Sequence, residues 1–225
     1  MGRAVGRAGG VLPFVSEADR REAIPKVCAH LRAGGILGYP TETVYGLGSL
    51  PTEQGIEAVT RLKGRAPDKP FLLLLSGARM AEELGLVLTP AAVALSRAFW
   101  PGPLTLVLPG GEGRLPERLR GAEGGIAVRH TSHPGIAALV EALGAPLTST
   151  SANRSGEPPA PGAERLVASF RAAVESGRLM VLDGGVLGNV PPSTIVDCTG
   201  PVPRLVREGA IPRAELRRAA GSLAP

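Results

Sequence analysis

The chain has 225 residues, 44% of them hydrophobic, which is ordinary for a globular protein with one sizeable core or two small ones. No apolar run approaches the roughly 18 residues that a membrane span requires, so we expect no membrane partner. The formal net charge of +5 is spread along the chain and predicts an anionic partner, either nucleic acid or a polyphosphate ligand.

Cysteine use and the N-terminus bear on the cell compartment. Cys28 and Cys198 are far apart and lie in no motif, which suits a reducing compartment better than a disulfide framework. The first residues are rich in Gly and Arg and lack the apolar run of a signal peptide. We therefore expect a cytoplasmic protein with a disordered tail over residues 1–10 and one domain over residues 11–225.

The first predicted elements surround a polar loop. Apolar residues recur at helical spacing over residues 24–31, with Pro25 in the first turn, and Gly34 ends this helix. Residues 36–39 form a short buried strand that leads into TETVYGLG at residues 41–48, where polar side chains stand beside glycines. We interpret this segment as a ligand loop at a strand end. The alternative is a plain strand whose polar residues face solvent.

Basic residues are concentrated after the next helix. Thr52 is the expected N-cap of a helix that runs to Leu62 and delivers Lys63 and Arg65 just past its C-terminus. The chain has twenty-two arginines but only three lysines, and both Lys63 and Lys69 fall in this short segment. An ammonium and a guanidinium side by side predict a clamp for a polyanion. A solvated basic helix end is the alternative.

The rest of the chain alternates strands and helices, which predicts an α/β fold. Expected strands cover residues 71–75, 104–108, 126–128, 179–182, 193–197 and 203–206, with a brief strand at Leu147. Expected helices cover residues 89–99, 134–143, 163–174 and 212–220. Two Gly-rich loops, residues 110–124 and 155–162, are candidates for a mobile cover over a site.

Further polar groups carry weaker signals. The hydroxyl and amide run at residues 149–153 can bind phosphate or a metal-bound water, but an ordinary turn is the more common use of such a run. His130 and His133 have a spacing that a metal site could use, yet no other His or Cys is near, so we expect surface histidines. The common nucleotide fingerprints and the GxSxG elbow are absent from the sequence.

Four segments together resemble the threonylcarbamoyl-AMP synthase family of YrdC-like proteins. They are YPTETVYGL at residues 39–47, KGR at 63–65, WPGPLT at 100–105 and SANxSG at 151–156. The similarity continues through STI at 193–195 and REG at 207–209 and covers about residues 15–215. It implies a YrdC-like domain, a twisted mixed β-sheet with helices packed on it and a concave basic cavity.

The resemblance also implies an activity. Such a nucleotidyltransferase joins L-threonine, bicarbonate and ATP into threonylcarbamoyl-AMP and pyrophosphate, the first step of t6A formation in tRNA. Its partners would be these substrates, the proteins that receive the threonylcarbamoyl group, and RNA or tRNA on the basic surface. Mg²⁺ would enter on the ATP phosphates without a metal site of the protein. The alternatives are an RNA-binding module without ATP chemistry and a carbamoyl-adenylate enzyme with another acceptor.

The resemblance assigns roles to residues at matching positions. The catalytic and ATP-binding residues would be Lys63, Arg65, Ser151, Asn153 and Arg207, of which Lys63 and Arg65 are catalytic. The threonine-binding residues would be Thr41, Arg129 and Ser193.

The chain departs from the family pattern in two ways. Leu74 occupies the position where some relatives carry a His near threonine, so that contact would be missing or replaced. The chain ends at residue 225, which predicts the short form without an additional C-terminal domain.

Overall fold

The computed structural model describes residues 10–66, 69–188 and 190–224. Its helices are α1 (Glu17–Arg32), α2 (Glu53–Lys63), α3 (Ala78–Glu83), α4 (Pro90–Phe99), α5 (Pro134–Leu143), α6 (Ala163–Ser169), α7 (Arg171–Glu175) and α8 (Arg213–Ala220), with a 3-10 turn, η1 (Glu117–Leu119). Its strands are β1 (Val11–Pro13), β2 (Ile36–Tyr39), β3 (Gly46–Gly48), β4 (Leu72–Leu74), β5 (Leu104–Leu108), β6 (Ile126–Arg129), β7 (Leu147–Ser151), β8 (Leu179–Asp183), β9 (Thr194–Asp197) and β10 (Arg204–Arg207).

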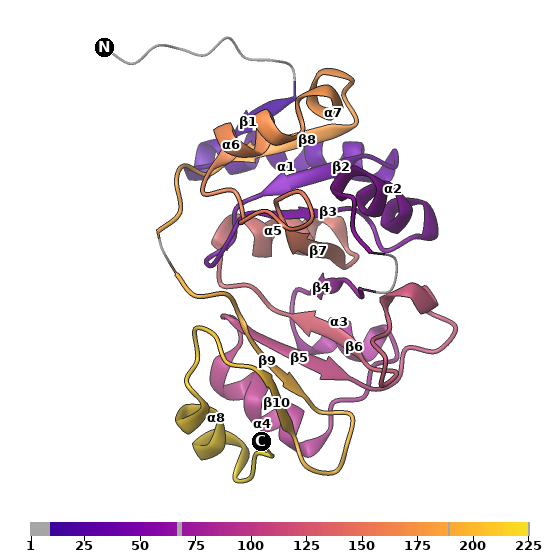
Figure 1. Cartoon of the computed structure of the whole chain (residues 1–225), viewed down its shortest axis with the longest axis vertical. Coiled ribbons are helices and arrows are strands. Elements are labelled where there is room, and N and C mark those ends of the chain that lie inside the picture. Colours follow the sequence, from indigo (N-terminus) through magenta and orange to yellow (C-terminus); the bar gives the residue numbers. More distant parts are fainter. Residues whose placement is uncertain (1–9, 67–68, 189, 225) are drawn as a thin grey trace.

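The strands form one ten-stranded sheet in the order β1-β8-β2-β3-β7-β4-β6-β5-β9-β10. The short strand β4 joins the two halves, because it pairs antiparallel with β7 and parallel with β6. Figure 1 shows one half, with β1, β8, β2 and β3, above β7 and β4, and the other half, with β6, β5, β9 and β10, below them. The predicted mixed α/β sheet with packed helices is confirmed.

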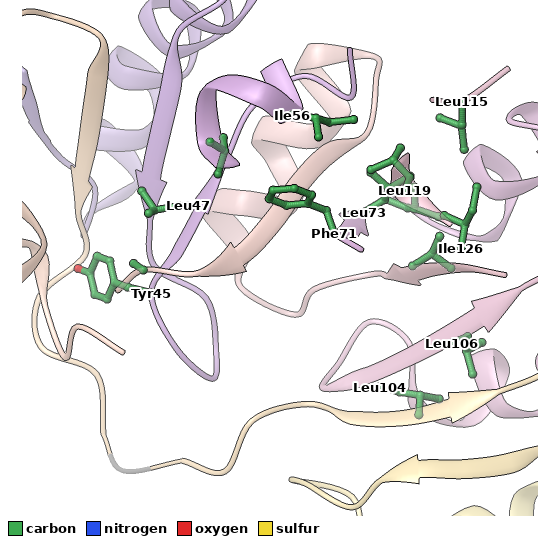
Figure 2. Close-up of a cluster of buried hydrophobic side chains, with 14 of the residues drawn as sticks. Tyr45, Leu47, Ile56, Phe71, Leu73, Leu104, Leu106, Leu115, Leu119 and Ile126 are labelled. Carbon is green, nitrogen blue, oxygen red and sulfur yellow. The ribbon is translucent and has the colours of Figure 1, made fainter. Parts of the chain in front are cut away.

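Buried apolar side chains fill both faces of the sheet. On one face, α1 and α5 pack through residues such as Val27 and Leu139 against Leu37 and Leu147 of the strands. The other face carries a larger cluster that runs from β3 through β4 to β6 and β5, and Figure 2 shows part of it around Phe71. Complete burial of one such Leu or Phe stabilises the fold by about 1.5–3 kcal/mol, so the two clusters hold the helices on the sheet.

The start of α1 corrects the sequence analysis. Ser16 Oγ accepts a hydrogen bond from the Asp19 backbone N at 3.1 Å, and the Asp19 carboxylate accepts one from the Ser16 backbone N at 2.8 Å. This capping box begins the helix at Glu17. Pro25 therefore lies inside the helix and not in its first turn. The buried face of α1, including Val27, outweighs the poor local propensity of Pro25.

The end of α2 also differs slightly from expectation. The Thr52 hydroxyl accepts from the Gly55 backbone N at 3.0 Å, as the predicted N-cap should. The helix ends at Gly64, whose φ of 64° is left-handed and easiest for glycine. Lys63 is thus the last helical residue, while Arg65 lies beyond the helix as expected.

Other boundaries need correction as well. The predicted helix over residues 163–174 is split at Phe170 into α6 and α7. The loop over residues 110–124 contains η1 and buries Leu115 and Leu119 in the core, which makes it a poor candidate for a mobile cover. Of the tail expected to be disordered, residues 1–9 lie outside the described residues, whereas Gly10 is buried and its carbonyl accepts from the Val181 backbone N at 2.7 Å.

Candidate active site

Strand alternation collects polar side chains on one face of the sheet. Leu74 of β4 pairs with both Leu147 of β7 and Arg129 of β6, so the three residues share a face. By the same alternation along β7, Ser149 and Ser151 point to this face. The sheet therefore presents the serines of β7 and the guanidinium of β6 on one side.

The first group of polar residues surrounds the end of α2. The Lys63 ammonium donates to the backbone oxygen of Ser151, to Ser151 Oγ at 3.2 Å and to Asn153 Oδ1 at 2.7 Å. Arg65 Nη1 donates to Thr150 Oγ1 at 3.1 Å, and its guanidinium stacks over the Phe71 ring at 5.0 Å. We call Lys63, Arg65, Ser151 and Asn153 the Lys63 cluster.

Electrostatics makes the ammonium of this cluster sensitive to a bound anion. Burial, followed by the positive charges of Arg65 and Lys69, lowers the pKa of Lys63 from 10.5 to about 8. Lys63 is therefore mostly charged at neutral pH, but its charged form is poorly solvated. An anion that entered the cluster would stabilise that form, and such shifted pKa values are frequent in functional sites.

A second group surrounds Arg129, whose side chain is 4% exposed. Its Nε donates to the Gly102 carbonyl at 3.2 Å, its Nη1 donates to Thr43 Oγ1 at 3.3 Å, and its Nη2 lies 2.6 Å from Glu42 Oε1. The N–H bonds of Nη2 are not directed at that oxygen, so this buried nitrogen donates no hydrogen bond within the described chain. Thr41 joins the group through its hydroxyl, 3.1 Å from that of Thr43.

Glu42 is ionised in this environment. Burial raises the pKa of its carboxyl, but the positive charge and close approach of the Arg129 guanidinium, together with hydrogen bonds from Thr131 and Ser132, outweigh burial and bring the pKa down from 4.5 to about 2. The pair of Arg129 and Glu42 is therefore a buried ion pair at neutral pH.

Ser193 and Arg207 extend the second group. Ser193 Oγ lies 2.9 Å from Thr105 Oγ1, and Arg207 Nη2 donates to the Ser193 carbonyl at 2.7 Å. Thr105 lies on β5, which pairs with β6, the strand that ends at Arg129. Burial and then the positive charge of Arg129 lower the pKa of Arg207. We call Thr41, Glu42, Thr43, Arg129, Ser193 and Arg207 the Arg129 cluster.

The two clusters are neighbours on the sheet without direct contact. In the part of the chain that the structure describes, no hydrogen bond or ion pair joins Lys63 to Arg129 or Arg207. Arg129 is level with Leu147 of β7, and Ser151 is four residues further along β7, about 13 Å along the strand at the usual rise. Because β4 lies between β7 and β6, the separation across the sheet adds about 10 Å sideways. The separation suits two ligands side by side, or one extended ligand.

The environments of two histidines, of Leu74 and of Glu42 were not fully anticipated from the sequence. His130 and His133 are half-buried, less exposed than expected for surface histidines. The His133 ring accepts from the Ile136 backbone N at 3.3 Å and stacks on Phe14. Leu74 is fully buried among the apolar residues beneath α1 and α5. The sequence analysis placed Glu42 in a candidate ligand loop but gave it no role of its own, although an acidic residue between two threonines after a buried strand was a usable signal.

The pocket described next does not include the residues of either cluster. A pocket of about 640 Å³ is lined by the C-terminal turn of α1, by α2 and by the turn before β8, away from both clusters. The concave basic cavity thus stays a prediction.

Among residues 10–66, 69–188 and 190–224, no group of three or more His, Cys, Asp or Glu is arranged to hold a metal ion. The described helices include none that is both long and apolar enough to span a membrane.

The molecule is an α/β protein whose mixed sheet carries one group of polar and cationic side chains around Lys63 and another around Arg129. Residues 29–209 match the model of the Sua5, YciO and YrdC family, which carries the description "Telomere recombination". The chain belongs to this family.

Individual relatives agree with this membership. The threonylcarbamoyl-AMP synthase of Thiobacillus denitrificans is 40% identical over 193 residues, which cover 84% of this chain and all of that one. The synthase of Pyrococcus abyssi is 34% identical over 194 residues, and the match covers 86% of this chain but only 56% of that one. The chain thus spans one relative completely and just over half of the other.

Solved structures show the same fold. The crystal structure of P. abyssi Sua5 complexed with L-threonine superposes with a TM-score of 0.86 at 30% identity, covering 95% of this chain and 62% of that one. The crystal structure of E. coli YciO gives a TM-score of 0.76 at 27% identity, covering 88% and 95%. The YrdC-like fold that the sequence predicted is confirmed.

Proposed function

We propose that the protein is a threonylcarbamoyl-AMP synthase, which joins L-threonine, bicarbonate and ATP into threonylcarbamoyl-AMP and pyrophosphate. Relatives that bear this name match most of the chain. The observation that carries the proposal is the Lys63 cluster, in which a buried ammonium of lowered pKa stands beside a guanidinium and hydroxyl groups. This combination suits a triphosphate. The product would serve t6A formation in tRNA.

The two clusters divide the substrates between them in this proposal. Lys63, Arg65, Ser151 and Asn153 would hold the ATP phosphates. Thr41, Arg129 and Ser193 would hold threonine, whose carboxylate suits the buried Nη2 of Arg129 that lacks a hydrogen-bond acceptor. Arg207, in contact with Ser193, would reach the nucleotide from the threonine side.

The reaction needs positioning and charge neutralisation more than a protein nucleophile. The threonine amine adds to the carbon of bicarbonate, and water leaves to give a carbamate. A carbamate oxygen then attacks the α-phosphorus of ATP, and pyrophosphate departs. Both steps bring anions together, so Lys63 and Arg65 would act by lowering repulsion and fixing the phosphates. Mg²⁺, carried on phosphate oxygens of ATP, would neutralise further charge when bound.

An unstable carbamate also needs protection from water. The loop over residues 155–162 has neither helix nor strand and begins beside the Lys63 cluster, where the Ser155 backbone N donates to the Lys63 carbonyl at 3.0 Å. We propose this loop as the cover of the nucleotide.

The direct test is pyrophosphate release by the purified protein. We expect release that requires threonine, bicarbonate, ATP and Mg²⁺ together, with threonylcarbamoyl-AMP detected by mass spectrometry. Release that is independent of threonine would contradict the proposal. Replacement of threonine by other amino acids in the same assay tests the alternative of a carbamoyl-adenylate enzyme with another acceptor.

Cellular partners form a separate part of the proposal. We expect the enzyme in the cytoplasm, with the threonylcarbamoyl group passed to downstream transfer proteins. The outer face of α8 carries Arg213, Arg217 and Arg218 around an open pocket of about 720 Å³, and phosphate groups of RNA could bind there. RNA affinity that falls steeply with salt, and that is lost when these arginines are changed to Gln, would support the contact.

A further inference from the structure

Glu42 ties the loop after β2 to the segment that follows β6. Its Oε2 accepts from Thr131 Oγ1 at 2.5 Å, and its Oε1 accepts from the Ser132 backbone N at 3.0 Å. The same Oε1 lies 2.6 Å from Arg129 Nη2. Both carboxylate oxygens are thus fixed by groups other than Arg129, which makes Glu42 an anchored partner for that guanidinium.

The other contacts of Arg129 are weaker. The Gly102 carbonyl and the Thr43 hydroxyl are neutral acceptors at 3.2 Å and 3.3 Å. Of the groups that contact Arg129 in the described part of the chain, Glu42 alone carries a negative charge. A guanidinium with 4% exposure needs a counter-ion to stay in place, because an unpaired buried charge is strongly unfavourable.

The geometry of the pair leaves binding capacity for a ligand. Nη2 of Arg129 is buried and donates no hydrogen bond within the described residues, although Glu42 neutralises its charge at close range. A buried donor without an acceptor is costly, and the acceptor that best fits a guanidinium is a carboxylate.

We propose that Glu42 is a positioning residue for substrate recognition: it holds Arg129 so that Nη2 is presented to the carboxylate of the amino-acid substrate. This inference rests on the proposed function, in which that substrate is threonine. Glu42 acts through Arg129 and takes no part in bond making. If Glu42 were instead a placeholder that competes with the substrate carboxylate, its replacement by Gln would make threonine bind more tightly.

Calorimetric titration of threonine and of ATP into the wild type and Glu42→Gln tests the proposal. Gln keeps an acceptor for Thr131 but removes the charge, so Arg129 should shift. We expect threonine affinity to fall about 10- to 100-fold, the range that a small misplacement of a binding group produces. ATP affinity should stay within about twofold, because the Lys63 cluster is separate. A loss of both affinities in equal measure would indicate a merely structural role and overturn the proposal.

A substrate analogue makes the readout specific for the carboxylate. The wild type should prefer threonine to L-threoninamide, which lacks the negative charge, and Glu42→Gln should lose most of this preference. Unchanged preference, or tighter threonine binding in the variant, overturns the proposal. Glu57→Gln is the matched control, because Glu57 forms ion pairs with Arg61 and Arg118 outside both clusters and should leave all affinities unchanged.

A second variant decides the matter if Glu42→Gln does not fold. Thr131→Val removes one anchor of Glu42 without changing any charge, and we expect a smaller loss of threonine affinity, about 3- to 10-fold, with ATP affinity retained. Equal threonine affinity in Thr131→Val and the wild type would then overturn the inference. If the wild type itself does not bind threonine, the proposed function fails, and the inference fails with it.

Discussion

The Nζ atom of Lys63 lies 2.7 Å from Oδ1 of Asn153, which joins the last residue of α2 to the loop after β7. The two residues are ninety positions apart in sequence, so the contact exists only because β3 and β7 pair and bring both elements to one end of the sheet. Asn153 Oδ1 also accepts a hydrogen bond from the Ser151 hydroxyl at 2.5 Å. The ammonium is therefore held in a fixed position before any ligand enters.

Replacement of Lys63 by Ala should abolish most of the catalytic activity. The variant loses the ammonium that we place on the ATP phosphates, and loss of one such group typically lowers kcat by about 100-fold or more. The measurement is the rate of threonine-dependent pyrophosphate release. Lys26→Ala is the control, since Lys26 is an exposed residue paired with Glu22 on α1. Activity of Lys63→Ala within a few fold of the wild type would remove the main support for the proposed function.

ATP binding should weaken as pH rises through the pKa of Lys63. The pKa of about 8 means that the ammonium is charged below this pH and increasingly neutral above it. The dissociation constant of ATP should therefore increase between about pH 8 and pH 10. Isothermal titration across this range measures it. Lys63→Arg keeps its charge throughout and should show no such increase, whatever its affinity at pH 7.

Much of the fold was predictable because local patterns and burial agree. Residues 36–39, 104–108 and 134–143 matched their elements, since short apolar runs bounded by Gly or Pro leave few alternatives. The strand at residues 11–13 was missed, because its pairing with β8 depends on residues far away in sequence. The start of α1 was misjudged because Pro25 was given more weight than the capping box at Ser16.

The site was predictable in its residue types but not in its pairings. In sequence, the basic segment after α2 could equally be a solvated helix end, and the hydroxyl run at residues 149–153 could be an ordinary turn. Only the pairing of β7 with β3 and β4 brings Ser151 to Lys63. The ion pair joins Glu42 to Arg129, which are 87 positions apart (129 − 42). No local spacing pattern in the sequence indicates this pairing. The roles of these residues stay predictions.

The contribution of the Glu42 carboxylate to stability should be lost in acid. Its folded-state pKa of about 2 is below the ordinary 4.5, so its contribution is fully present above about pH 4.5 and is lost as pH falls towards 2. The free energy of unfolding of the wild type should therefore approach that of Glu42→Gln as pH is lowered through this window. Denaturant titrations at several pH values measure the difference between the two proteins. A difference that does not change with pH would show that Glu42 is not ionised by its neighbours.

Gly48 should tolerate no side chain, because of how closely β3 and β7 approach. A Cβ built on Gly48 would lie 1.8 Å from the backbone oxygen of Thr148, and a backbone atom in a paired strand cannot move aside without disturbing the sheet. The Thr148 oxygen also accepts from the Tyr39 hydroxyl at 3.1 Å, and the Ser49 backbone N donates to the Thr148 hydroxyl at 2.8 Å, so a shift would disturb these contacts too.

Gly48→Ala should therefore lower the free energy of unfolding by about 3 kcal/mol, the upper part of the range for overpacked cores. Urea denaturation followed by circular dichroism measures this change. Gly188→Ala is the control, because a Cβ there meets no atom within 4 Å and should change stability by less than about 0.5 kcal/mol. Since β3 lies between β2 and β7, Gly48→Ala should also displace Ser151 from Lys63 and reduce ATP affinity. A stable Gly48→Ala protein with normal ATP affinity would mean that the two strands are further apart than described.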